Sequence, residues 1–228
     1  MAVLLYLAPK MQSSAKKNKF DDTDFTKSFE EAMKRIPQSD GRKDIFDLLK
    51  QGLANAQTVN NESSWMASAD DFFKEARVLN DELKTILYKG SIMGFEKVLE
   101  FNPGNLTAKA RLGASYVESA SLLGNPPMKG IAILREVVKQ DSNNIEANLQ
   151  LGLFSVSSQQ FDKAIERFNR ILKIDSTQVD MYAYLGDVYM QMGNKPKAIE
   201  SLENYKNRVK DNVTIRNIDN YIKKLKIN

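Results

Sequence analysis

The 228-residue sequence contains no cysteine and no histidine. Without them the chain cannot form a disulfide, a thiolate or imidazole metal site, or the nucleophile and histidine pair of many hydrolases. Most familiar catalytic centres are therefore excluded. We expect a protein that is not an enzyme, uses no cofactor, holds no metal ion and acts on no small-molecule substrate. The lack of cysteine fits a reducing and an oxidising compartment equally well.

Carboxylates are the candidates that remain for acid–base or metal chemistry. They gather at Asp21, Asp22 and Asp24 and again at Asp70 and Asp71, but neither cluster has the spaced pattern of a calcium-binding loop. Acidic residues near a helix start usually interact with the helix dipole. A hydrolase that relies on these carboxylates stays as an alternative without a motif to support it.

The net charge of +4 comes from 33 basic and 29 acidic residues. Residues 213–228 alone contain four basic residues and one acidic residue, so most of the excess lies at one end of the chain. A nucleic-acid-binding surface normally spreads its basic residues along a face. We therefore do not expect nucleic acid as the partner, and a nucleic-acid-associated accessory protein is kept only as an alternative.

The N-terminus carries an apolar run over residues 2–8, followed by Pro9 and a polar segment with several lysines. The run is shorter than the ~20 residues that span a bilayer. We interpret residues 1–20 as an apolar remnant and flexible linker, in which the run is the end of a truncated membrane anchor on the periplasmic side. The alternative is a cytoplasmic protein with a frayed or locally packed terminus.

Residues 21–71 show two amphipathic patterns with helical spacing. The first contains Phe25 and Phe29 and ends before Pro37, and the second contains Phe46, Leu49 and Leu53. They predict a helical hairpin. The Asn- and Ser-rich residues 55–64 that follow predict a loop before the single tryptophan.

From about residue 72 the sequence repeats. Leu-Gly pairs end at Gly113, Gly152 and Gly186, with steps of 39 and 34 residues. Alanines open the second helix of two repeats, and large apolar residues follow them. A glycine on one helix and an alanine on the next permit close approach, while large side chains fill the flanking space. The residues expected to pack the repeats are Gly113, Gly152, Gly186, Ala164, Ala198 and Phe168.

This spacing resembles the tetratricopeptide repeat family, in its bacterial type, whose helix–turn–helix period is 34 residues. The resemblance implies an all-α, right-handed α-solenoid. Its repeats would comprise a degenerate repeat at 72–105, one with an insertion at 106–144, and regular ones at 145–178 and 179–212. The insertion is expected around Asn125. Residues 213–228, with Ile218 and Ile222 on one face, predict a helix that caps the last repeat; a membrane-surface or RNA contact is the alternative.

In this family the first helices of successive repeats line a concave groove. The resemblance implies that residues from three helices line it, together with the alanines at 110, 114 and 183. The main residues are Val117, Glu146, Leu149, Leu153, Val156, Asp180, Asp187 and Met190. Such a surface is apolar with an acidic edge, which suits a hydrophobic or basic helical segment better than a C-terminal carboxylate. In the alternative arrangement, the N-terminal hairpin itself fills the groove.

The function expected from these patterns is that of a non-catalytic scaffold that binds an unidentified partner protein or helical peptide. The scaffold would be tethered to a membrane where the N-terminal run is part of an anchor. The lengthened repeat also weakly resembles the tetratricopeptide domains of cytochrome c maturation proteins. An assembly factor or chaperone-like accessory of a membrane or envelope complex is therefore the alternative function.

Overall fold

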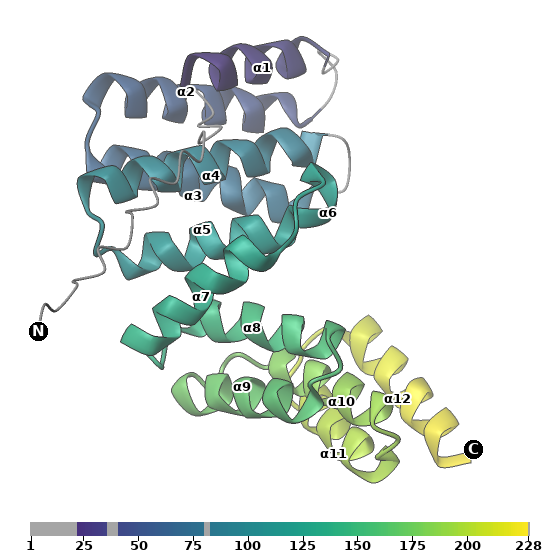
Figure 1. The fold of residues 1–228 in the computed structure, drawn as a ribbon. Helices are drawn as coiled ribbons and strands as arrows, with labels where there is room; N and C mark the ends of the chain where they lie inside the picture. Colours follow the sequence, from purple (N-terminus) through teal and green to yellow (C-terminus); the bar gives the residue numbers. More distant parts are fainter. Residues whose placement is uncertain (1–21, 36–40, 80–82, 228) are drawn as a thin grey trace, which may run out of the picture.

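The computed structural model describes residues 22–35, 41–79 and 83–227. These residues form twelve α-helices and no strand, and the helices stack in pairs along one direction (Figure 1). The all-α solenoid expected from the sequence is confirmed, with two helices before the stacked pairs and one helix after them.

The N-terminal part contains four helices: α1 (Asp22–Lys34), α2 (Lys43–Val59), α3 (Glu62–Val78) and α4 (Leu83–Phe101). The pair α3 and α4 makes the most extensive contact, α2 packs on α3, and α1 packs on α4. The two expected amphipathic helices are present, and the expected turn at Pro37 lies outside the described residues.

Aromatic side chains hold this part together. The ring of Phe72 on α3 meets those of Phe25 and Phe29 on α1 edge-on, with centroids 5.5 and 5.2 Å apart. Phe46 on α2 stacks on Phe29 at 5.9 Å. All four rings are buried. Such pairs contribute beyond the burial of their area, so they fix α1 and α2 on the α3–α4 pair.

The remaining chain forms three helix pairs and a cap. The helices are α5 (Leu106–Glu118), α6 (Ala120–Leu123), α7 (Met128–Gln140), α8 (Ile145–Ser157), α9 (Phe161–Ile174), α10 (Asp180–Gln191), α11 (Lys195–Lys206) and α12 (Asn212–Ile227). The pairs are α5 with α7, α8 with α9, and α10 with α11, and each pair packs mainly on its neighbours. This is the contact pattern of a solenoid.

Asparagine side chains mark several helix starts. Asn61, Asn105 and Asn144 accept hydrogen bonds from backbone N–H groups in the first turns of α3, α5 and α8. Asn194 does the same for α11, whose first turn contains Pro196. Each cap satisfies a donor that the helix itself leaves free. The first helix of three successive pairs therefore begins in the same way.

The start of the first pair differs from the expectation. The loop expected at residues 55–64 is wrong, because α2 continues to Val59 and α3 begins at Glu62. Residues 71 and 72, where a boundary was expected, both lie inside α3. The spacing of Trp65, Ala69 and Phe72 matches that of Tyr182, Gly186 and Tyr189 in a regular repeat, so this signal marks the true start of the pair.

Glycines lie at the crossings of the paired helices. A Cβ atom added at Gly152 would lie 2.6 Å from the ring of Phe168, and one at Gly113 would lie 2.7 Å from Leu134. At Gly186 the nearest atoms belong to Leu202, at 3.1 Å. Opposite these glycines, the two alanines at 164 and 198 are fully buried. In each pair, a large side chain of one helix therefore packs against a glycine of the other helix, where no side chain stands in the way.

Two features depart from a regular repeat. The short helix α6, ended by Gly124 with a left-handed φ of 64°, lies between α5 and α7 just before Asn125. At the C-terminal end, Ile218 and Ile222 of α12 are buried in a cluster with Leu202 of α11. The last helix thus covers the apolar face of α11, as a solenoid cap does.

We expect Gly152→Leu to destabilise the fold by ~1–3 kcal/mol, because the new side chain overlaps Phe168. Thermal unfolding followed by circular dichroism should show a melting temperature lowered by about 2 °C or more. Gly52→Ala is the matched control. No atom lies within 4 Å of a Cβ at this helical glycine, so alanine should raise stability by ~0.5–1 kcal/mol. An unchanged melting temperature for Gly152→Leu would contradict the proposed contact.

We expect Ile222→Ala to remove ~2–5 kcal/mol of stability, and to do so locally, because solenoid repeats contact mainly their neighbours. Hydrogen exchange should then speed up in α11 and α12 and stay unchanged in α3 and α4. Tyr221→Ala serves as the control, since Tyr221 is 45% exposed and Ile222 only 3%. Equal acceleration along the whole chain would show that α12 is not a local cap.

Candidate functional site

The first helices of the pairs, α3, α5, α8 and α10, form a row along the molecule. Helix α5 contacts both α3 and α8 directly. Helices α1 and α2 cover α4 and α3 at one end of this row and lie far from α10 at the other end (Figure 1). The N-terminal helices therefore leave α8 and α10 uncovered. We call the side chains that α5, α8 and α10 present along this row the inner face.

The apolar residues expected on the inner face are partly used in packing. Leu149, Leu153 and Val156 of α8 are half-buried and pack against the core formed by α9 and α10. Val117 of α5 is half-buried beside Gly130 of α7. Their remaining exposed surface is available to a ligand, and the rest of each side chain stabilises the repeat.

Two alanines that were expected to line the groove contribute no exposed surface. Ala110 is 1% exposed and Ala114 is fully buried. The direct contacts of α5 with α3 and α8 leave no room between these helices. The expectation that the groove continues over this part of α5 is therefore wrong.

The acidic residues of α10 behave differently. Asp180 and Asp187 are exposed, and Met190 is half-buried. Asp187 accepts a hydrogen bond from the amide of Gln191 at 2.8 Å. No lysine or arginine in the described part of the chain forms an ion pair with either aspartate. Both carboxylates thus keep their negative charge facing solvent.

Glu146, the third acidic residue expected on the inner face, is paired with an arginine that it shares with Glu118. Arg77 of α3 lies between Glu118 of α5 and Glu146 of α8, and donates to each carboxylate through two nitrogens. The distances run from 2.5 to 3.3 Å. The guanidinium also lies 4.0 Å from the centroid of the Phe73 ring, within the range of a cation–π interaction. One side chain therefore joins three first helices.

Further donors complete this cluster. Gln150 of α8 donates to both Glu118 and Glu146, and the Tyr88 hydroxyl donates to Glu118 at 2.8 Å. Burial alone would lower the pKa of Arg77, but its hydrogen bonds to the two glutamates outweigh that effect and raise the pKa. Burial, reinforced by the charge of Glu118, raises the pKa of Tyr88. These side chains are thus held to one another by hydrogen bonds and ion pairs. We call them the Arg77 cluster, which comprises Arg77, Tyr88, Glu118, Glu146 and Gln150.

The inner face consequently has two parts. Near α3 and α5 the polar side chains are paired with each other, including Arg111 of α5 with Asp70 of α3. Near α8 and α10 the surface is half-apolar, and its exposed carboxylates have no cationic partner.

Tyrosines border the second part. Tyr184 is 36% exposed and stacks on Phe168 at 5.3 Å. Burial, together with the charge of Asp180, raises the pKa of Tyr184. Burial and a hydrogen bond to Asp180 raise that of Tyr205. These aromatic side chains add contact area beside Asp180.

The sequence reasoning missed Arg77, Gln150 and Tyr184. Gln150 and Tyr184 occupy the same position of successive repeats, one residue beyond an expected groove position, so a wider stripe would have included them. Arg77 lies where no repeat register had been assigned, and its signal becomes readable only once Trp65 and Ala69 are recognised as the start of a pair.

The acidic clusters considered for metal binding do not converge. Within residues 22–35, 41–79 and 83–227, no three acidic side chains gather into a group able to hold a metal ion. Asp70 pairs with Arg111, and Asp71 lies 3.8 Å from Lys74. Asp21 and the side chain of Asp22 lie outside the described residues.

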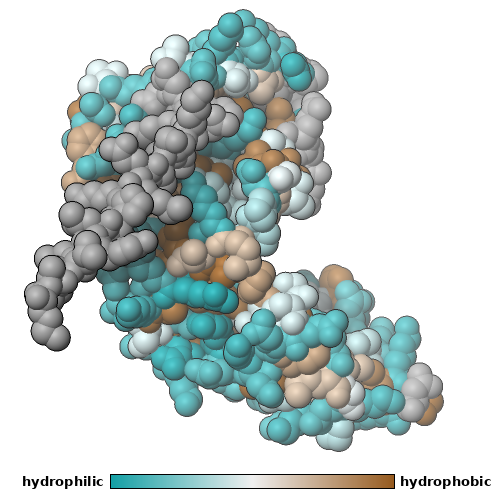
Figure 2. All heavy atoms as spheres, in the orientation of Figure 1, coloured by the Kyte–Doolittle hydropathy of each residue, from teal (hydrophilic) through white to brown (hydrophobic). Residues whose placement is uncertain are grey.

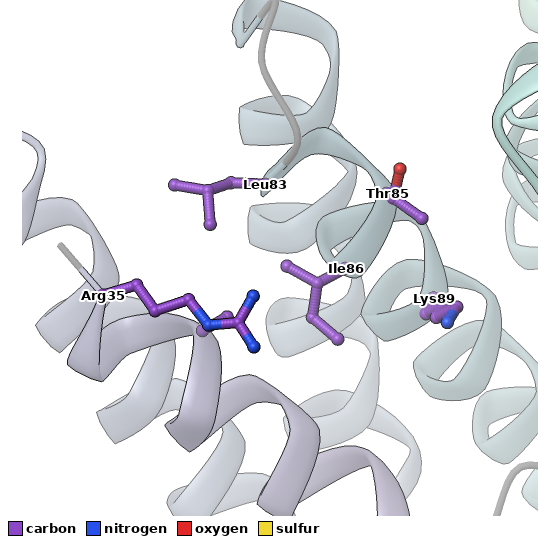
Figure 3. A pocket seen from close by; sticks show the side chains of 6 residues that line it. Arg35, Leu83, Thr85, Ile86 and Lys89 are labelled. Atoms are coloured by element: carbon purple, nitrogen blue, oxygen red, sulfur yellow. The ribbon is translucent and has the colours of Figure 1, made fainter.

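A small cavity lies away from the inner face, between α1 and α4. Its volume is about 180 Å³, and Arg35 points across it towards Ile86, with Leu83 and Lys89 at its edge (Figure 3). Its lining residues Arg35 and Leu83 are next in sequence to residues 36–40 and 80–82, which are outside the described part of the chain. Its place at the end of the molecule separates it from the helices of the inner face.

No described helix is both long enough and apolar enough to cross a membrane. The N-terminal run expected to be part of an anchor lies outside the described residues.

Comparisons with known proteins agree with this architecture. Among solved structures, MamA residues 41 to the end from Desulfovibrio magneticus RS-1 is 18% identical and has a TM-score of 0.55. That match covers 81% of this chain and 95% of MamA. PilW, described as a widely conserved type IV pilus biogenesis factor, is 17% identical with a TM-score of 0.57. The match covers 85% of this chain and 80% of the PilW chain. At these identities the two structures show a shared fold.

No curated protein sequence matches the chain. The family model described as tetratricopeptide repeat matches residues 155–216. This segment runs from the end of α8 into α12 and contains the crossings at Phe168 and Gly186. The match shows tetratricopeptide repeat similarity over this segment, and the stacked helix pairs and the folds of the two similar structures agree with it.

Proposed function

We propose that the chain is a non-catalytic scaffold that binds a helical segment of a partner protein on the part of the inner face formed by α8 and α10. The observation that carries the proposal is the contrast along this face. In the Arg77 cluster both carboxylates are hydrogen-bonded to the same guanidinium, whereas Asp180 and Asp187 are exposed without cationic partners beside half-exposed Leu153 and Met190. A segment with apolar and basic side chains complements that surface.

The energetics of such an interface favour a few anchors. Half-buried leucines, an unbranched methionine and the exposed Tyr184 offer contact area that a partner's apolar side chains can bury. The aspartates then orient the partner through its basic residues and disfavour an acidic one. Apolar area therefore supplies most of the affinity, and charge supplies the selectivity.

A membrane tether at the N-terminal end is a second part of this proposal. It is supported by the apolar run at residues 2–8 and the lysines that follow it. A scaffold held in this way would collect its partner close to the bilayer, as an assembly factor of a membrane or envelope complex does.

We expect Asp187→Lys to weaken binding of a fluorescein-labelled amphipathic peptide of leucines and lysines at helical spacing. Fluorescence anisotropy should show at least a tenfold higher Kd, equivalent to about 1.4 kcal/mol. Glu200→Lys is the matched control. It makes the same charge change at an exposed residue of α11, a second helix of its pair. If both variants bind the peptide like the parent protein, the proposed face is not the binding site.

We expect Leu153→Asp to raise the Kd for the same peptide at least tenfold, because it places a charge among the apolar anchors. Leu153 also packs against the α9–α10 core, so circular dichroism must show that helicity is retained. Leu48→Asp, at a leucine of α2 that is 66% exposed, makes the same chemical change away from the inner face. Unchanged peptide affinity in a folded Leu153→Asp variant would place the binding site elsewhere.

A further inference from the structure

The outward side of α12 carries a pattern that capping does not explain. Ile218 and Ile222 point into the cluster with α11. On the opposite side of the helix, Val213, Asn220 and Ile227 recur every seven residues, which is close to two full turns. Val213 is 54% exposed and Ile227 is 84% exposed. A cap needs one apolar face, so a second stripe that exposes an apolar residue near each end of the helix, with the polar Asn220 between them, calls for a separate reason.

Basic side chains flank this stripe. Arg216 and Lys223 lie on one side of it and Lys224 on the other, and all three are exposed. None of them forms an ion pair with the described residues. By contrast, Lys206 is held by Glu203 and Asp219 on the inward side. We call Val213, Arg216, Asn220, Lys223, Lys224 and Ile227 the outward face of α12.

Acidic groups near the outward face are engaged elsewhere. Asp219 pairs with Lys206 at 2.9 Å. Asp211 accepts a hydrogen bond from the backbone N–H of Thr214 at 2.7 Å and so caps the helix start. Glu203 pairs with Lys206 and lies 3.8 Å from Lys226. The outward face is therefore positively charged without local compensation.

The position of α12 leaves this face open. Helix α12 packs on α11 and forms the C-terminal end of the solenoid, and no described helix lies beyond it (Figure 1). In space-filling view, the C-terminal end of the molecule mixes hydrophilic and apolar surface (Figure 2). A helix of 16 residues at the end of the stack can meet a flat surface along its length.

We propose that the outward face of α12 docks the protein on an anionic lipid surface. Its cations would lie among lipid phosphates, and Val213 and Ile227 would reach the boundary between headgroups and acyl chains. Two alternative occupants fit less well. A second copy packed symmetrically on this face would bring like charges together. Single-stranded RNA is usually held by stacking on aromatic side chains, and none of the six residues of the outward face is aromatic. This proposal does not depend on the peptide-binding function of the inner face.

Sedimentation of the full chain with vesicles tests this proposal. The vesicles contain either phosphatidylcholine alone or phosphatidylcholine with 30% phosphatidylserine. We expect binding to the anionic vesicles, which should weaken as salt rises because added ions screen the charges. Lys223→Gln with Lys224→Gln should lower the partition coefficient about tenfold or more, since each cation near such a surface contributes strongly. Ile227→Asn should lower it further at constant charge.

Lys139→Gln with Lys173→Gln is the matched control. It removes the same charge from exposed residues of α7 and α9 and leaves α12 and residues 1–21 intact. A loss for the α12 variant and not for this control supports the proposal. Equal losses, no binding of the parent protein to anionic vesicles, or a loss of RNA binding by the α12 variant with vesicle binding retained would each overturn it. Leu153→Asp should leave vesicle binding unchanged, which separates this surface from the inner face.

Discussion

The fold depends on a single kind of contact, in which a large side chain of one helix covers a residue without a bulky side chain on its pair partner. Phe168 over Gly152 and Leu134 over Gly113 are two instances, and Phe72 over Gly90 is another in the first pair. Because the backbones approach closely at these points, the flanking apolar residues can interlock. The direction of the stack, and hence the placing of every first helix in one row, follows from repeating this crossing.

Much of this was predictable because the crossing leaves a sequence signature. Leu-Gly pairs and alanines at fixed spacing identified the repeats from residue 106 onward, and alternating apolar and charged residues identified the cap. The start of α3 was missed because its crossing uses Ala69 in place of glycine and Ser68 in place of leucine. The polar residues 55–64 also suggested a loop, although asparagine capping at Asn61 allows one helix to end and the next to begin within a few residues.

The exposure and the ion pairing of the residues expected on the inner face were predictable only in part. Counting acidic residues along the expected stripe predicted an acidic edge, and two of these residues, Asp180 and Asp187, are exposed. Glu146 does not contribute, because Arg77 reaches it from a residue 69 positions earlier in the chain. Ala110 and Ala114 have the right register but lie where α5 touches its neighbours on both sides. The repeat register predicts which face of a helix a residue occupies. Whether that residue is exposed or forms an ion pair depends on the side chains of the neighbouring helices.

The Arg77 cluster has a consequence for how the molecule comes apart. In a simple solenoid each unit contacts only the next, and unfolding can begin at either end and stop between any two units. Here a single guanidinium connects α3, α5 and α8, so the first pair and the third are linked without an intermediary. The segment from α3 to α8 should therefore melt as one cooperative block, while α10 to α12 can fray independently. The surface proposed for partner binding, on α8 and α10, lies where the cooperative block meets the part that can fray independently.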